Sequence, residues 1–286
     1  MKYVYIDQNG KIFEDEDAGK KVMENNDHDY ADPNKGIILV PEKRWGFAQL
    51  GEYNSWMQNK KSSDDRNFDH FKEFNQYDII KNFYFDNAIE LGCGPFTNIR
   101  IIGNICSIDK VSLLDPLINE YLNHPNCRYD KENLYLENMF FEKCAINGIL
   151  FKIKKKCKIG KKIPINVLLP IPIEKMLTQE KYDLCVIINV LEHCYDLNLI
   201  FANILSILKP NGILIFHDKF YKSKDVFVES KFQFDIAHPL KPNKEIIMNF
   251  LDNNFTPLYK RFKNYNREWL GESLSNEMIY FIGKKT

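Results

Sequence analysis

The sequence lacks several features that would assign a protein to a class at once. It has no long apolar run: the longest, from Leu184 to Leu191, contains Asn189 and is less than half of a membrane span. The amino terminus has no apolar run followed by small residues, so no signal peptide is expected. The seven cysteines form no Cys-x-x-Cys pair. This favours reduced thiols in a cytoplasmic protein and predicts neither a disulfide framework nor a metal site.

Net charge is absent as well. Lys+Arg and Asp+Glu number 39 each among the 286 residues, so the chain as a whole is not attracted to nucleic acid or to an anionic membrane. We therefore expect neither among its partners, and the sequence leaves a homodimer open. A hydrophobic content of 44% suffices for one substantial core.

Strand and helix patterns alternate from about residue 83 to the carboxyl terminus. Continuous apolar strands are expected at 87–92, 111–115, 182–189 and 212–218, helices at 197–208 and 243–254, and final strands at 255–262 and 277–285. Such alternation predicts a mostly parallel sheet with helices on both faces, an α/β Rossmann-like domain spanning residues 81–286.

Two segments depart from this regularity. Residues 1–80 form an amino-terminal arm whose stretch 44–57 places Trp45, Phe47, Tyr53 and Trp56 at helical spacing. These aromatics either dock the arm on the core or form a lid over a ligand. Residues 123–166 are interpreted as an insertion, with a hairpin turning at Gly160. Its seven lysines between 152 and 162 indicate a solvated face, with an anion site as the alternative.

The segment 88–95, Ala-Ile-Glu-Leu-Gly-Cys-Gly-Pro, carries the chemistry. A buried strand ends in Glu90 and is followed by Gly92 and Gly94, which suit a tight turn that approaches a ligand closely. A dinucleotide fingerprint would have a third glycine where Thr97 stands. The Glu90 carboxylate would repel a pyrophosphate but attract an ammonium group. Charge therefore favours S-adenosylmethionine over NAD.

This segment resembles the first motif of the class I, Rossmann-like methyltransferases, which have a seven-stranded sheet. Asp115, at the end of the next strand, matches the acid that binds the ribose hydroxyls in that family, and Asp109 is a competing candidate. Residues 182–193, ending in Leu-Glu-His, resemble the fourth-strand motif of the type 11 and type 12 subfamilies. Residues 172–176 match the turn beside the adenine. Phe96 departs from the family, which often has a small residue there. The resemblance implies S-adenosylmethionine as cofactor, bound by Glu90, Gly92, Cys93, Gly94, Asp115, Ile173, Glu174 and Asn189.

Methyl transfer to a hydroxyl needs a general base. His217 is the first candidate because it ends a core strand together with Asp218, at the sheet edge where open α/β sheets bind ligands. His193 can serve as a base or pack its helix. His238 lies in a loop that could cover the acceptor.

The sequence excludes one class of methyl acceptor. Asn189 is followed by Val-Leu-Glu and not by the Pro-Pro-aromatic signature of enzymes that methylate amines of nucleic acids. The resemblance therefore implies O-methylation of a small molecule or a sugar. An amine acceptor remains an alternative, as does a non-catalytic subunit that binds the cofactor.

Overall fold

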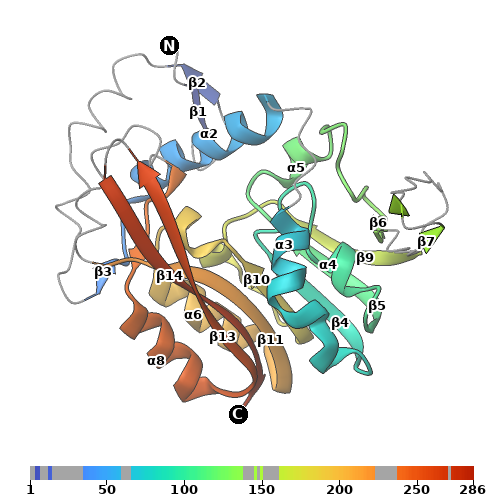
Figure 1. Cartoon of the computed structure of the whole chain (residues 1–286). Helices are drawn as coiled ribbons and strands as arrows, with labels where there is room; N and C mark the ends of the chain where they lie inside the picture. The colour runs from blue at the N-terminus through green and yellow to red at the C-terminus, as the bar shows by residue number, and fades with distance from the viewer. Residues whose placement is uncertain are drawn as a thin grey trace.

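Eight strands form one mixed sheet (Figure 1). The computed structural model describes residues 4–6, 12–14, 35–58, 66–137, 145–146, 149–150, 161–222, 237–269 and 272–286. In chain order, the strands of this sheet are β4 (Tyr84–Leu91), β5 (Ser107–Leu114), β6 (Asn133–Tyr135), β9 (Lys162–Leu169), β10 (Tyr182–Ile188), β11 (Leu208–Phe220), β13 (Phe255–Trp269) and β14 (Glu272–Lys285).

The strand order is β13-β14-β11-β10-β4-β5-β9-β6. β9, β5, β4, β10 and β11 are parallel, whereas β14, β13 and β6 each pair antiparallel with a neighbour. The predicted Rossmann-like sheet is confirmed. Its count is eight and not seven because β6, only three residues long, joins the edge beside β9.

The central strands are apolar along their length because both faces are covered. In β10, Cys185 and Ile187 belong to one hydrophobic cluster and Leu184 and Val186 to another, as the alternation of side chains across a strand requires. The first cluster includes residues of α6 (Leu197–Ile207) and α8 (Lys244–Asn254). The second includes residues of α3 (Arg66–Glu73), η2 (Asn75–Ile80), α4 (Ile99–Ile102) and α5 (Ile118–Tyr121).

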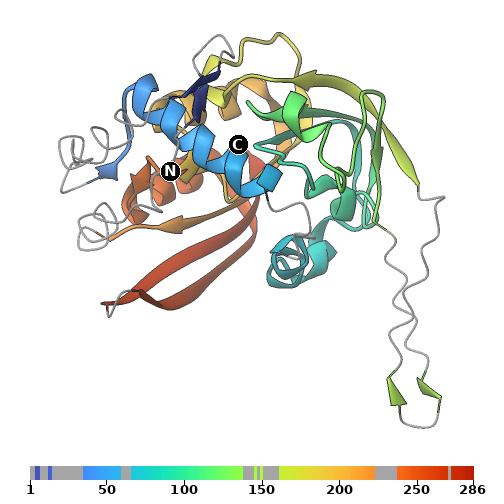
Figure 2. The same cartoon turned by 90° about the horizontal axis from the view of Figure 1, so that it is seen from above.

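The amino-terminal arm crosses the sheet at its carboxyl edge. Its helix α2 (Glu42–Gln58) and the strand β3 (Gly36–Ile37), which pairs with β12 (Lys241–Pro242), anchor it. Figures 1 and 2 show α2 lying across the ends of the central strands. The structure also describes two small hairpins: β1 (Val4–Ile6) with β2 (Ile12–Glu14), and β7 (Ala145–Ile146) with β8 (Ile149–Leu150). The boundary proposed at residue 80 stays a prediction.

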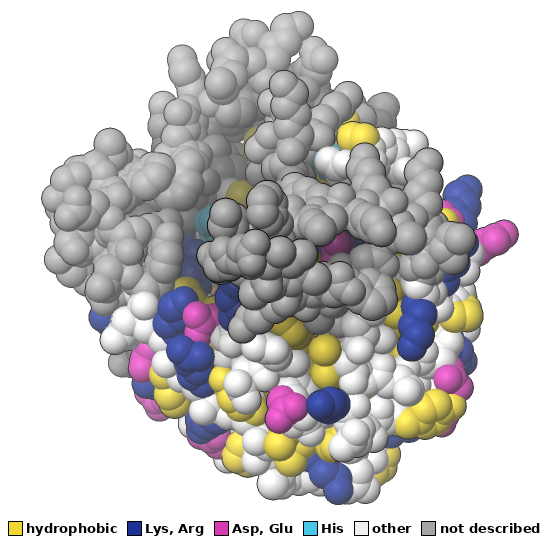
Figure 3. Space-filling model, turned by 45° about the vertical axis from the view of Figure 1, so that its right-hand side comes forward, with side chains coloured by type: hydrophobic (Ala, Val, Ile, Leu, Met, Phe, Trp, Pro, Cys, Tyr) yellow, Lys and Arg dark blue, Asp and Glu magenta, His cyan; other side chains and the backbone are white. Residues whose placement is uncertain are grey.

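Much of the predicted insertion, residues 138–144, 147–148 and 151–160, lies outside the described residues. Gly160 and the lysines up to residue 158 lie there, so the expected hairpin stays untested. Lys161 and Lys162 are described and exposed. On the face shown in Figure 3, basic and acidic side chains of the described part are intermixed and form no continuous patch of one charge. Within the described residues, no helix is both long and apolar enough to span a membrane.

Candidate active site

The turn after β4 is tied to the end of the neighbouring strand. The backbone amides of Gly92 and Cys93 both donate to the carbonyl of Leu114, at 2.8 and 3.1 Å. The turn therefore folds over the end of β5, where Asp115 follows directly. This brings the two halves of the predicted motif together at one sheet edge.

Both glycines adopt left-handed backbone conformations, with φ of 69° at Gly92 and 54° at Gly94. A Cβ at Gly92 would lie 2.6 Å from the methyl carbons of Val190, so that position is closed by packing. A Cβ at Gly94 would meet no described atom within 4 Å. Gly94 therefore faces open space, where the backbone can approach a ligand.

Glu90 does not face this space. Its carboxylate is 1% exposed and accepts hydrogen bonds from the Thr97 hydroxyl and from the backbone amides of Asn98 and Ile99. Burial raises the pKa of Glu90, although these hydrogen bonds act in the opposite direction. The sequence suggested a direct contact between Glu90 and the ammonium group of a ligand, and the position of this side chain corrects that prediction. Glu90 lies behind the turn and fixes the start of α4.

Asp115 does face the cavity and also holds the turn. Its Oδ2 accepts from the Gly94 amide at 3.0 Å and its Oδ1 from the Leu117 amide at 2.9 Å. Burial raises the pKa of Asp115 to about 6. Asp109 lies near the opposite end of β5, bonded to the Tyr84 hydroxyl, and does not line the cavity. The structure thus favours Asp115 over Asp109.

A cavity of about 900 Å³ opens between α2, α3 and the carboxyl ends of the strands. This is at the upper end of the size range of small-molecule sites. Its lining carries more carboxylates than basic groups: Glu52, Asp69, Glu73, Asp115, Glu174 and Glu192 against Arg66, Lys219 and Lys263. The excess of negative charge suits a cationic ligand.

Three further predicted cofactor residues line the same cavity. Ile173 and Glu174 lie in η3 (Ile173–Lys175), and Glu174 Oε1 accepts from the amides of Tyr195 and Asp196 at 2.6 and 3.1 Å. Glu174 Oε2 is buried without a hydrogen-bond partner among the described residues, so it remains able to accept one. Asn189 follows β10 in a left-handed conformation with φ of 58°.

His217 and Asp218 project from opposite faces of β11. The His217 ring lines the cavity, stacks on Tyr280 with centroids 4.1 Å apart, and hydrogen-bonds through Nδ1 to the Ile279 carbonyl at 2.8 Å. A carbonyl only accepts, so Nδ1 carries the proton and Nε2 keeps its lone pair. Burial, followed by the nearby His70, holds the pKa of His217 well below its usual range.

Asp218 lies outside the cavity lining, which corrects its predicted catalytic role. Its Oδ2 accepts from the Leu191 amide at 2.9 Å and its Oδ1 from the Lys219 amide at 2.8 Å. Burial, with a smaller effect of Glu192, raises the pKa of Asp218 to about 7. Adjacent residues of a strand point to opposite faces, so Asp218 points away from the cavity that His217 lines. Its hydrogen bond to Leu191 instead fixes the loop after β10.

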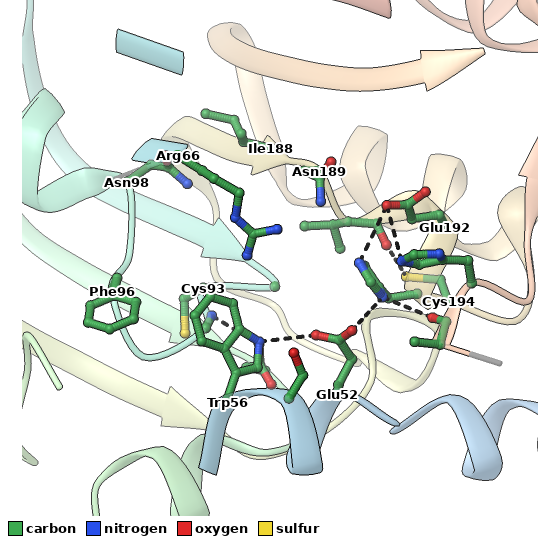
Figure 4. A pocket seen from close by; sticks show the side chains of 18 of the residues that line it. Glu52, Trp56, Arg66, Cys93, Phe96, Asn98, Ile188, Asn189, Glu192 and Cys194 are labelled. Carbon is green, nitrogen blue, oxygen red and sulfur yellow. Dashed lines mark hydrogen bonds and ion pairs between the residues drawn. The ribbon is translucent and has the colours of Figure 1, made fainter. Parts of the chain in front are cut away.

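His193 also lines the cavity, within a group of ionisable side chains of which Glu52 and Glu192 are labelled in Figure 4. Its Nδ1 is 2.9 Å from the Ala237 carbonyl and 3.3 Å from a Glu52 oxygen. The Nε2 atoms of His193 and His238 lie 3.6 and 3.5 Å from Glu192 Oε1. The sequence indicated both histidines, but it did not place them together.

Helix α2 both docks on the core and covers the cavity. The indole nitrogen of Trp45 donates to the His193 carbonyl at 3.1 Å, and its ring packs against Tyr195. Farther along the helix, Trp56 lines the cavity, and its ring centroid lies 5.6 Å from that of Phe96. Trp45 therefore docks the helix on the core and Trp56 lines the cavity, while the function of the arm as a lid over a ligand stays a prediction.

Arg66 and Glu52 are cavity residues that the sequence analysis did not identify. The Arg66 guanidinium lies over the Trp56 ring at 5.3 Å, and Figure 4 shows it pointing into the cavity. Neither residue belongs to a recognisable motif, and only the fold brings them to the sheet edge.

Comparison with known proteins agrees with this geometry. Residues 152–216, less than a quarter of the chain, match the family model described as "Methyltransferase domain". No curated protein matches the chain. This part of the chain is thus similar to a methyltransferase domain, which agrees with the resemblance that the motifs indicated.

Several solved structures are similar in fold. The N-methyltransferase NodS from Bradyrhizobium japonicum, in complex with S-adenosyl-l-homocysteine, is 14% identical with a TM-score of 0.48, over 82% of this chain and 98% of that one. The 1,6-didemethyltoxoflavin-N1-methyltransferase from Burkholderia thailandensis is 10% identical with a TM-score of 0.45, over 90% and 98%. At these values the likeness does not identify the acceptor of this chain.

Proposed function

We propose that this chain, a methyltransferase with S-adenosylmethionine as its cofactor, methylates a hydroxyl oxygen of a small molecule or a sugar that enters the cavity beneath α2. The observation that supports this function best is the cavity itself. It is bounded by the Gly92–Gly94 turn and by Asp115, and its charged residues are mostly acidic. The cofactor supplies a methyl group already activated on a sulfonium.

The residues present fit that cofactor. Each Asp115 oxygen accepts one backbone amide and has a further lone pair for a ribose hydroxyl. Glu174 Oε2 is a buried acceptor without a hydrogen-bond donor among the described residues, and the amine of an adenine could supply one. Gly94 presents bare backbone to the cavity. Cys93 and Asn189 complete this side of the cavity.

The acceptor would lie between this side and the histidines. His217 can receive the hydroxyl proton at Nε2, while the Ile279 carbonyl keeps the ring oriented. Its lowered pKa makes it a weak base. His193 is the second candidate, because Glu52 and Glu192 flank its ring.

An amine acceptor is the second candidate function. The excess of carboxylates in the cavity would attract an ammonium group as well as the cofactor. Turnover of amines but not alcohols in a panel of acceptors would support it.

Cofactor binding without turnover of any acceptor would instead favour a non-catalytic subunit. The sequence leaves a homodimer open, and the oligomeric state of the chain is a separate measurement.

Parallel calorimetric titrations with S-adenosylmethionine and NAD test the proposal. We expect saturable binding of the first only, because the acidic lining repels a pyrophosphate. Binding of NAD instead would refute the assignment. A His217→Asn variant is expected to lose turnover of the acceptor while its affinity for S-adenosylmethionine stays unchanged. Unchanged turnover would exclude His217 as the base.

A further inference from the structure

Four side chains from three separate segments lie close together in the cavity lining. Glu52 comes from α2, Glu192 and His193 from η4 (Leu191–His193), and His238 from the loop before β12. We call them the His–Glu cluster. Figure 4 shows Glu52 and Glu192 directed toward the same end of the cavity.

The distances within the cluster are those of metal ligands. Metal-binding atoms of Glu52, His193 and His238 all lie within 4.8 Å of one another. Glu192 Oε1 is 3.6 Å from His193 Nε2 and 3.5 Å from His238 Nε2. Tetrahedral ligands held at about 2.1 Å from a metal lie about 3.4 Å from each other. The two rings and Glu192 thus already have nearly the required spacing.

The surrounding groups prepare these atoms to bind a metal. The Ala237 carbonyl accepts from His193 Nδ1, so in the neutral ring the lone pair is on Nε2. A ligating histidine typically donates its other nitrogen to a carbonyl in this way. Glu192 Oε2 is held by the Tyr221 hydroxyl and by Lys219, which leaves Oε1 directed at the rings.

The ligand types also limit the choice of ion. A metal site needs ionised carboxylates and neutral imidazoles. Two imidazoles with carboxylates suit first-row divalent transition metals better than Mg²⁺, which prefers oxygen ligands alone.

We propose that the His–Glu cluster binds one divalent transition-metal ion, and that this ion takes the acceptor hydroxyl as a further ligand. The inference rests on the proposed function. A hydroxyl bound to such an ion loses its proton to water far more readily than a free one, since metal binding lowers the pKa of bound water to about 7. The weakly basic His217 would then not need to ionise the acceptor alone.

Titration of the chelator-treated, full-length protein with Co²⁺ and Zn²⁺ tests the site, with Mg²⁺ in parallel. We expect one Co²⁺ ion per chain, with an absorption spectrum that reports nitrogen ligands. Glu52→Gln and His238→Asn are each expected to weaken binding more than tenfold. Glu42→Gln is the matched control, because Glu42 lies on the same helix, is exposed and pairs with Lys175.

Two results would overturn the proposal. One is the absence of saturable Co²⁺ binding in the wild type, which would mean that the rings only form ion pairs with Glu192. The other is wild-type affinity in both cluster variants. Thermal unfolding verifies that each variant is folded; if His238→Asn is not, Glu52→Gln decides. Calorimetry with S-adenosylmethionine separates the two proposals, because a protein that binds the cofactor but no metal loses only this inference.

Discussion

Replacing each glycine of the turn by alanine should have different consequences. A left-handed conformation costs an alanine about 1–2 kcal/mol, and both positions incur this cost. At Gly92 the new methyl group would also meet Val190 at 2.6 Å, and such overpacking adds about 1–3 kcal/mol. We therefore expect Gly92→Ala to lower the free energy of unfolding by about 2–5 kcal/mol and Gly94→Ala by about 1–2 kcal/mol.

The order should reverse for the cofactor. The methyl group of Gly94→Ala would project into the open space beside Asp115, where the backbone approaches the ligand. A loss of about 1.4 kcal/mol corresponds to a tenfold weaker affinity, and we expect at least that. Gly92→Ala points its methyl group at Val190 and away from the ligand. Under conditions where it remains folded, its affinity should change less.

Urea unfolding and calorimetry with S-adenosylmethionine measure the two quantities. Val190→Ala provides a further control, because it removes the methyl carbons that the Gly92→Ala side chain would contact. In the Val190→Ala background, Gly92→Ala should cost less than in the wild type. Equal stability of the two alanine variants would refute the packing of Gly92 against Val190. Wild-type affinity in Gly94→Ala would refute the assignment of this turn to cofactor binding.

Two further predictions concern Asp115 and Trp45. The pKa of Asp115 is raised from 3.8 to about 6, so the folded state retains this proton longer than the unfolded chain does. The contribution of Asp115 to stability should thus fall as the pH rises from about 4 to about 6, whereas affinity for the cationic cofactor should rise as the carboxylate ionises. Both trends should vanish in Asp115→Asn, as urea unfolding and calorimetry at several pH values would reveal; a persisting trend would assign the titration to another group. Trp45→Phe removes the hydrogen bond to the His193 carbonyl and should lower the free energy of unfolding by about 1 kcal/mol. Trp56→Phe, which removes a bond within α2 only, should cost less, and equal losses would argue against docking of the arm through Trp45.

The sequence predicts the fold correctly where long apolar segments end in turns. The strands around Ala88, Leu113 and Val186 lie where the sequence predicts them, since burial on both faces requires continuous apolar residues. Helices α4 and α5 are only four residues long each, and the three-residue strand β6 was not predicted. Such short elements carry too few residues to display a period.

The sequence by itself determined the features that reside in neighbouring residues: the Gly92–Gly94 turn and the acid at the end of β5. Tertiary structure decided which side chains reach the cavity. It turned Glu90 behind the turn and Asp218 to the opposite face of β11. It also brought Glu52, 141 residues away in the sequence, to within 3.3 Å of His193. A motif fixes the order of its residues along the chain, but side-chain direction and long-range neighbours depend on packing that no local pattern encodes.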